Sequence, residues 1–122
     1  MKATELRIGN FVYNEWGKVD EIVKLTRLGI FTECDSQKVQ PIPITEEWLL
    51  KFGFEESVKN WFSKKLHQDR DHQINVNVRF EKCLCMEISI QGYAVPLPNK
   101  QYIHELQNVF YELTNEELQP NS

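Results

Sequence analysis

The amino-acid sequence predicts an α+β fold. Short apolar segments separated by turn residues fill residues 1–44, which indicates a small β-barrel subdomain. Residues 74–90 alternate between apolar and polar side chains, and residues 102–113 carry apolar side chains at helical spacing. We therefore expect the subdomain at 1–44 and a helix–sheet–helix unit at 45–122, packed together as one cooperative domain.

The N-terminal subdomain is expected to contain four or five short strands. Two apolar segments flank the sequence "NEWG", in which Asn14 and Gly17 bracket a hairpin loop, and Leu28 with Gly29 forms the next turn. Short strands with tight turns favour a strongly bent sheet, and the segment from "RIGNFV" to "VQPIPI" resembles an SH3-like barrel. About 44 residues are few for an independent core, so this subdomain should pack against the rest of the chain.

A short helix is expected to begin the second unit. Thr45 suits an N-cap, and the two glutamates after it place negative charge where the helix dipole favours it. An apolar stripe runs from Trp48 to Phe52, and Gly53 is a natural stop for the helix.

Three antiparallel strands are expected to follow this helix. The sequences "INVNVRF" and "CLCMEISIQ" alternate without a fault, which is typical of a sheet with one buried face and one wet face. The sequence "NWFSKKL" is the expected third strand. The polar sequence "HQDRDH" is expected to form the loop that joins it to the next strand.

A C-terminal helix is expected to cover the apolar face of this sheet. Asn99 is the predicted N-cap, and apolar side chains recur at helical spacing up to residue 113. Thr114 and Glu117 match a capping box that would begin a further short turn. His104 lies outside the apolar stripe and is expected to be solvated.

Composition and charge are those of an ordinary soluble protein. Of the 122 residues, 41% are apolar and 26% are charged, and no run approaches the ~18 apolar residues of a membrane span. The N-terminal sequence lacks the apolar stretch of a secretory signal, so the expected location is cytoplasmic. The three cysteines lack the spacing of a disulfide framework. A net charge of −4 disfavours general affinity for nucleic acid, although residues 59–92 carry a small positive excess.

Two blocks of the sequence resemble a known family. "PIPITEEWLLKFGF" and "YIHELQNVFYELTNEEL", with "LRIGN" near the start, resemble a family of small uncharacterised proteins found on prophages and other mobile elements of gut bacteria. The likeness covers most of the chain. It implies a mobile-element origin and, by analogy with other proteins of this size on such elements, a protein that binds or inhibits a host protein.

Two groups of residues have side chains that can bind metals. The first lies in "HQDRDH" and consists of His67, Asp69, Asp71 and His72. The second consists of Cys83 and Cys85, with Cys34 as a distant third. A solvated hairpin loop uses the same residues as the first group, and structural zinc sites usually need four ligands at known spacings. We therefore expect neither a metal nor another cofactor.

The sequence does not predict a catalytic site. Nucleophilic catalysis needs a serine, cysteine or threonine near a base that a third group orients, and the candidate base, His104, is expected to be solvated. The five glycines are scattered, so the sequence has no phosphate-binding loop. We expect a protein that is not an enzyme.

The wet face of the predicted sheet is the candidate binding surface. Its residues are Trp61, Lys65, Asn75, Asn77 and Arg79. Tryptophan and arginine are frequent hot spots of protein interfaces, and the same set suits the stacking and neutralisation of a single nucleic-acid strand. A further alternative is that the N-terminal subdomain or the short helix buries Trp61. We expect a protein-binding module, an inhibitor or adaptor of a host protein, with a nucleic-acid-binding accessory protein as the alternative.

Overall fold

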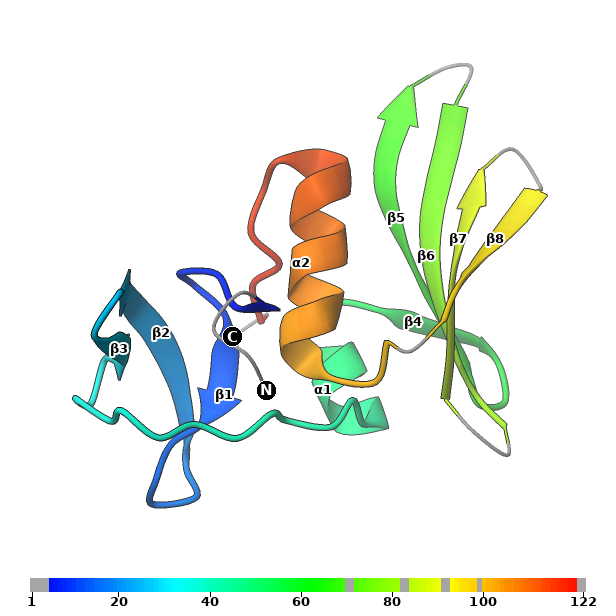
Figure 1. The fold of residues 1–122 in the computed structure, drawn as a ribbon. Helices are drawn as coiled ribbons and strands as arrows, with labels where there is room; N and C mark the ends of the chain where they lie inside the picture. The colour runs from blue at the N-terminus through cyan, green and yellow to red at the C-terminus, as the bar shows by residue number, and fades with distance from the viewer. Residues whose placement is uncertain (1–4, 70–71, 82–83, 91–92, 99, 121–122) are drawn as a thin grey trace.

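The computed structural model describes residues 5–69, 72–81, 84–90, 93–98 and 100–120. These residues form two antiparallel sheets and two helices, and α2 lies between the sheets (Figure 1). The α+β class is therefore confirmed. In chain order the elements are β1 (Phe11–Tyr13), β2 (Val19–Thr26), β3 (Gly29–Thr32), α1 (Glu46–Lys51), β4 (Glu55–Val58), β5 (Trp61–Asp69), β6 (His72–Phe80), β7 (Leu84–Ile90), β8 (Tyr93–Leu97) and α2 (Ile103–Thr114).

The N-terminal part of the chain forms a three-stranded sheet in the order β1-β2-β3. The predicted hairpin loop joins β1 to β2. The side-chain oxygen of Asn14 accepts the backbone N–H groups of Trp16 and Lys18 at 3.0 and 3.1 Å, and Gly17 adopts a φ of 75°. Such a φ favours glycine, so the sequence specifies this turn locally.

The structure does not confirm the predicted SH3-like barrel, because over the described residues no sheet closes into a barrel. The segment expected to close it, "VQPIPI" at 39–44, forms an isolated bridge with β1 between Tyr13 and Gln40. Two prolines in this segment have no N–H group, so they cannot donate to a continuous ladder.

The same segment instead joins the beginning of α2. The N–H of Ile103 donates to the carbonyl of Ile42 at 2.8 Å, and the N–H of Ile44 donates to the carbonyl of Gln101 at 3.1 Å. Both isoleucines of "VQPIPI" are buried in the core. The segment is therefore a connection between the two parts of the chain.

The second sheet has five strands in the order β4-β5-β6-β7-β8, two more than the sequence predicts. The four side chains of β4, "EESV", are all exposed, and β8, "YAVPL", contains Pro96. Neither strand shows the apolar–polar alternation that predicts a strand. β5 and β6 pair as far as Asp69 and His72, so much of "HQDRDH" is strand, not loop, and Asp71 lies outside the described residues.

α1 begins and ends as the sequence predicts. The Thr45 hydroxyl accepts the N–H of Trp48 at 3.3 Å, and Gly53 follows the C-cap residue Phe52 with a φ of 87°. Phe11 of β1 packs against Trp48 and Phe52, with ring centroids 5.9 and 6.4 Å apart. α1 therefore contacts the N-terminal sheet as well as the core that it shares with α2.

Two groups of buried apolar side chains form the interior. We call the one between α2, α1 and the five-stranded sheet the large core, and its members include Phe62, Val76, Val78, Met86, Leu106 and Phe110. We call the one under the three-stranded sheet the small core, and its buried members are Leu6, Val12 and Ile22. The sheet residues of the large core confirm the predicted alternation.

α2 begins later than predicted. Its N-cap is Tyr102, whereas the predicted cap, Asn99, lies outside the described residues. The carboxylate of Glu105 accepts the backbone N–H groups of Gln101 and Tyr102 at 3.0 and 3.2 Å. Glu105 thus fixes the entry of the chain into the helix, a role that the sequence pattern did not assign.

The predicted capping box after α2 is wrong. The Thr114 hydroxyl accepts the N–H of Glu116 at 3.1 Å, and Glu117 forms an ion pair with Arg7. Arg7 also lies over the ring of Tyr111, 4.1 Å from its centroid. The segment after α2 is therefore held by contacts with the N-terminal segment.

The polar face of α2 (His104, Gln107, Asn108 and Tyr111) packs against residues 5–11, contrary to the expected solvation. The Gln107 side-chain oxygen accepts the N–H of Phe11 at 2.7 Å, and its nitrogen donates to the carbonyl of Gly9 at 3.1 Å. The Asn108 amide donates to the carbonyl of Glu5 at 2.9 Å. The amide side chains of Gln107 and Asn108 thus supply partners for backbone groups, which must be satisfied when buried.

Candidate binding surfaces

The structure brings the predicted site residues together on the outer face, by which we mean the face of the five-stranded sheet that points away from α2. Cross-strand neighbours share a face, and Trp61 pairs with Arg79, as Lys65 pairs with Asn75. Both helices and the three-stranded sheet lie on the other side of this sheet (Figure 1). Trp61 is half-buried, and Asn77 is buried in the centre of the face.

Contacts within the outer face already engage three of the five residues, Trp61, Asn77 and Arg79. The Arg79 guanidinium lies 4.8 Å from the centroid of the Trp61 ring and 3.4 Å from a carboxylate oxygen of Glu87. The Asn77 amide donates to the other oxygen of Glu87 at 3.4 Å, and Glu81 lies 3.8 Å from Arg79. The outer face is therefore less basic than its predicted residues imply. The alternation predicts that Glu87 shares this face, but not that it would pair with Arg79.

A second candidate surface lies on the opposite, inner face of the sheet, and the sequence did not predict it. Tyr93 and Val95 of β8 pair with Ile90 and Ile88 of β7, which places all four side chains on the face that α2 covers further along. Yet Tyr93 is 78% exposed, Val95 49% and Ile90 37%. The apolar face therefore continues beyond the helix and remains exposed.

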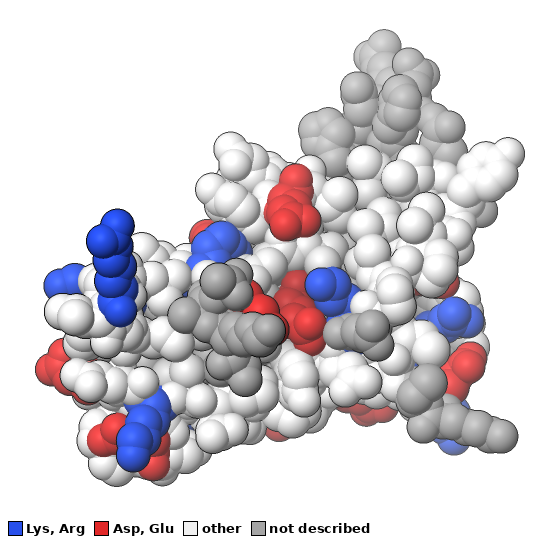
Figure 2. All heavy atoms as spheres, viewed as in Figure 1, with Lys and Arg blue, Asp and Glu red and all other residues white. Residues whose placement is uncertain are grey.

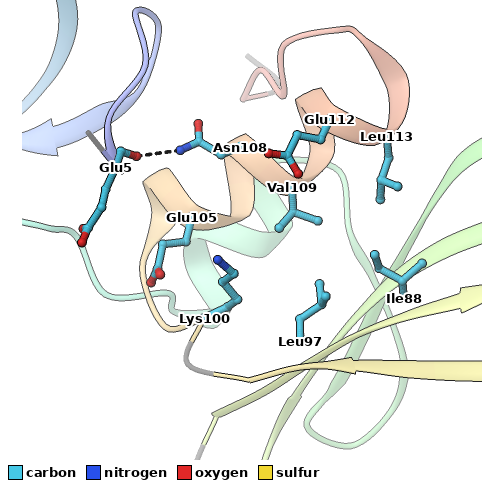
Figure 3. Close-up of a pocket in the computed structure, with 9 residues that line it drawn as sticks. All are labelled: Glu5, Ile88, Leu97, Lys100, Glu105, Asn108, Val109, Glu112 and Leu113. Carbon is cyan, nitrogen blue, oxygen red and sulfur yellow. Dashed lines mark hydrogen bonds between the residues drawn. The ribbon is translucent and has the colours of Figure 1, made fainter. Parts of the chain in front are cut away.

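A groove runs between this apolar surface and α2 (Figure 3). Ile88 and Leu97 point into it from the strands, and Val109 and Leu113 point toward them from the helix. A further hollow lies on the β5–β6 side of Leu113, and its other lining residues are Leu66, Ile74, Thr114 and Glu116. We use "inner groove" for these two hollows and the exposed side chains of Ile90, Tyr93 and Val95.

Acidic side chains surround the inner groove. Its described lining residues include Glu5, Glu105, Glu112 and Glu116, with Lys100 as the single basic one. Figure 2 shows the same contrast, because acidic patches over α2 adjoin an uncharged surface over β7 and β8. The groove therefore combines an apolar floor with a negative rim.

The described residues form no cluster of side chains that could hold a metal ion. In that part of the chain, no three His, Cys, Asp or Glu side chains come together as metal ligands. Cys34 is exposed beyond β3 whereas Cys85 belongs to β7, and Cys83 lies outside the described residues. None of the helices described is long and apolar enough to span a membrane.

His104, the candidate base, is buried rather than solvated. Its side chain is 1% exposed, it stacks on Tyr102 with centroids 5.9 Å apart, and its ring nitrogens make no hydrogen bond to the described residues. Burial lowers the pKa of His104, although nearby Glu105 and Glu5 act in the opposite direction. The His104 ring is therefore part of the packed interior between α2 and the N-terminal segment.

Comparisons with known proteins gave no match. No protein-family model, curated protein or solved structure matched this chain. The resemblance to prophage and mobile-element proteins therefore stays a prediction.

Proposed function

We propose that this chain is a non-enzymatic protein-binding module whose partner docks in the inner groove. The observation that supports this is the apolar face of β7 and β8 that α2 leaves exposed, with Tyr93 and Val95 at its edge. Contiguous exposed apolar surface with a polar rim is typical of interaction sites. Tyrosine is also enriched among the residues that contribute most to binding.

The mobile-element resemblance gives this proposal a more specific form. A binding module carried on such an element would act as an inhibitor or adaptor of a host protein. The outer face, with Trp61 and Lys65, stays a second predicted surface, and the same experiment distinguishes the two surfaces.

The nucleic-acid alternative receives less support. Phosphate binding depends on basic side chains that are free to pair with the backbone. On the outer face Arg79 is already paired with Glu87, and the rim of the inner groove is acidic. A strand of nucleic acid would meet a negative potential at one surface and a largely neutralised one at the other.

The test is affinity capture from a native host lysate, with and without nuclease, using three forms of the tagged protein. These are the wild type, Val95→Asp in the inner groove and Lys65→Glu on the outer face. Both side chains are exposed, so both variants should keep the thermal midpoint of the wild type within a few degrees. We expect a stoichiometric protein that survives nuclease, is kept by Lys65→Glu and is lost by Val95→Asp.

Two other results would contradict the proposal in different ways. Capture that disappears with nuclease would establish the nucleic-acid alternative. Capture that survives Val95→Asp but not Lys65→Glu would move the binding site to the outer face.

A further inference from the structure

We infer that the inner groove binds a cationic amphipathic helix of the partner protein. This inference rests on the proposed function and adds the chemistry of the partner. Three features carry it: the rim carboxylates without basic partners, the blocked edge of β8, and the two apolar hollows along α2.

The rim carboxylates are not neutralised within the described part of the chain. Glu112 and Glu116 form no ion pair there, and Glu5 lies 4.0 Å from His104, whose lowered pKa keeps the imidazole neutral near pH 7. Glu112 and Glu116 are exposed to solvent, in contrast to the half-buried Glu117, which pairs with Arg7. Charges left without a counterion beside an apolar surface favour a partner of opposite sign.

The edge of β8 disfavours a partner that adds a further strand. Pro96 lies within this edge strand and has no N–H group to donate. Proline on an edge strand is a common means by which proteins block pairing with another chain. A partner at this place therefore contributes side chains to the groove instead of a backbone ladder.

The shape of the groove suits the apolar side of a helix. Leu113 separates two hollows, one toward Ile88 and Leu97, the other toward Leu66 and Ile74. Apolar side chains one turn apart on a helix, about 5.4 Å along its axis, would enter these hollows in succession. The basic side chains on the flanks of the same helix would then meet Glu112 and Glu116.

The test uses two labelled synthetic peptides of about 18 residues with leucines at helical spacing. In one peptide all the remaining positions are lysine, and in the other they are all glutamate. Fluorescence anisotropy measures their binding to the full chain, and amide NMR shifts locate it. The variants are Val95→Asp, the double reversal E112K/E116K, and E15K/E55K, which changes the net charge equally at exposed positions outside the groove.

We expect the lysine peptide to bind and to shift amides of β7, β8 and the second half of α2. The glutamate peptide should bind at least about tenfold more weakly, because like charges repel across the rim. Val95→Asp and E112K/E116K should each lower the affinity for the lysine peptide by about tenfold. E15K/E55K should keep that affinity within about twofold of the wild-type value. Added salt should weaken binding further.

Several results would overturn the inference. They are no binding of the lysine peptide, equal binding of both peptides, shifts on the outer face, or equal losses in the two double variants. A dimer in solution that Val95→Asp dissociates would also overturn it, because a second copy would then occupy the groove. If a captured protein depends on Val95 but not on Glu112 and Glu116, the proposed function stands and only the cationic helix is wrong.

Discussion

The two sheets of this protein pack on the same helix through different chemistry. The five-stranded sheet contacts α2 through the large core, where side chains such as Leu106 and Phe110 are buried. The three-stranded sheet has the small core of Leu6, Val12 and Ile22. Its strand β1 bonds to the Gln107 amide of α2, and Phe11 and Tyr13 of β1 pack against the edge of the large core. A small sheet with little apolar interior of its own can therefore be held in part by polar side chains of a helix, which form hydrogen bonds to backbone groups of the sheet and of the segment before it.

The largest effect should come from truncating the large core. Leu106→Ala removes a fully buried side chain, so we expect the free energy of unfolding to fall by about 2–5 kcal/mol. The matched change in the small core, Val12→Ala, removes fewer buried carbons and should cost about 2 kcal/mol. Urea denaturation monitored by circular dichroism measures both.

The same pair of variants tests whether the two parts unfold together. If they form one cooperative domain, each variant shifts a single transition. A separate early transition in Val12→Ala would show instead that the three-stranded sheet unfolds independently.

The polar interface should respond to a change that leaves both cores intact. Gln107→Leu keeps the side-chain size but leaves the Phe11 N–H and the Gly9 carbonyl without partners, which should cost about 1–3 kcal/mol. Amide hydrogen exchange at Phe11 should become faster. In the control, Gln107→Glu, an acceptor for Phe11 is kept. Unchanged exchange at Phe11 in Gln107→Leu would contradict the proposed role of the amide.

The smallest effect concerns pH, through His104. An unfolded histidine takes up a proton near pH 6.5, but burial lowers the pKa of His104, so below that pH the unfolded state binds more protons. The free energy of unfolding should therefore fall as the pH drops through about 6.5, with a slope from this group of at most about 1.4 kcal/mol per pH unit.

The variant His104→Phe isolates this contribution, because it keeps an aromatic ring next to Tyr102 and removes the titrating group. Denaturation curves at several pH values should show a shallower dependence for the variant than for the wild type. Equal slopes would mean that His104 takes up its proton as readily in the folded state as in the unfolded state.

Local signals in the sequence predicted much of the fold. Thr45 and Gly53 delimit α1, Asn14 and Gly17 form their turn, and the alternation from residue 74 to residue 90 identifies the side chains of β6 and β7 that face the core. Each depends on interactions between residues that are close in the chain or on one repeating pattern.

The features that the sequence did not predict depend on distant contacts. Glutamine is a residue type that is usually solvated on a helix. The burial of Gln107 is explained only by its hydrogen bonds to the backbone of residues 9–11. β8 lacks alternation and contains a proline, so the sequence did not predict this strand. The inner groove depends on β8 and was therefore not predicted either. The five predicted residues share the outer face of the sheet, but the pairing of Glu87 with Arg79 changes the charge of that face.

The pairing of the N-terminal segment with α2 has a consequence for synthesis on the ribosome. Its hydrogen bonds and ion pair join residues 96 to 110 positions apart. β1 is therefore translated long before the side chains that satisfy its backbone, and contacts of such sequence separation form slowly. Until α2 has been translated, the Phe11 N–H that Gln107 binds in the folded protein can hydrogen-bond only to water or to a temporary partner.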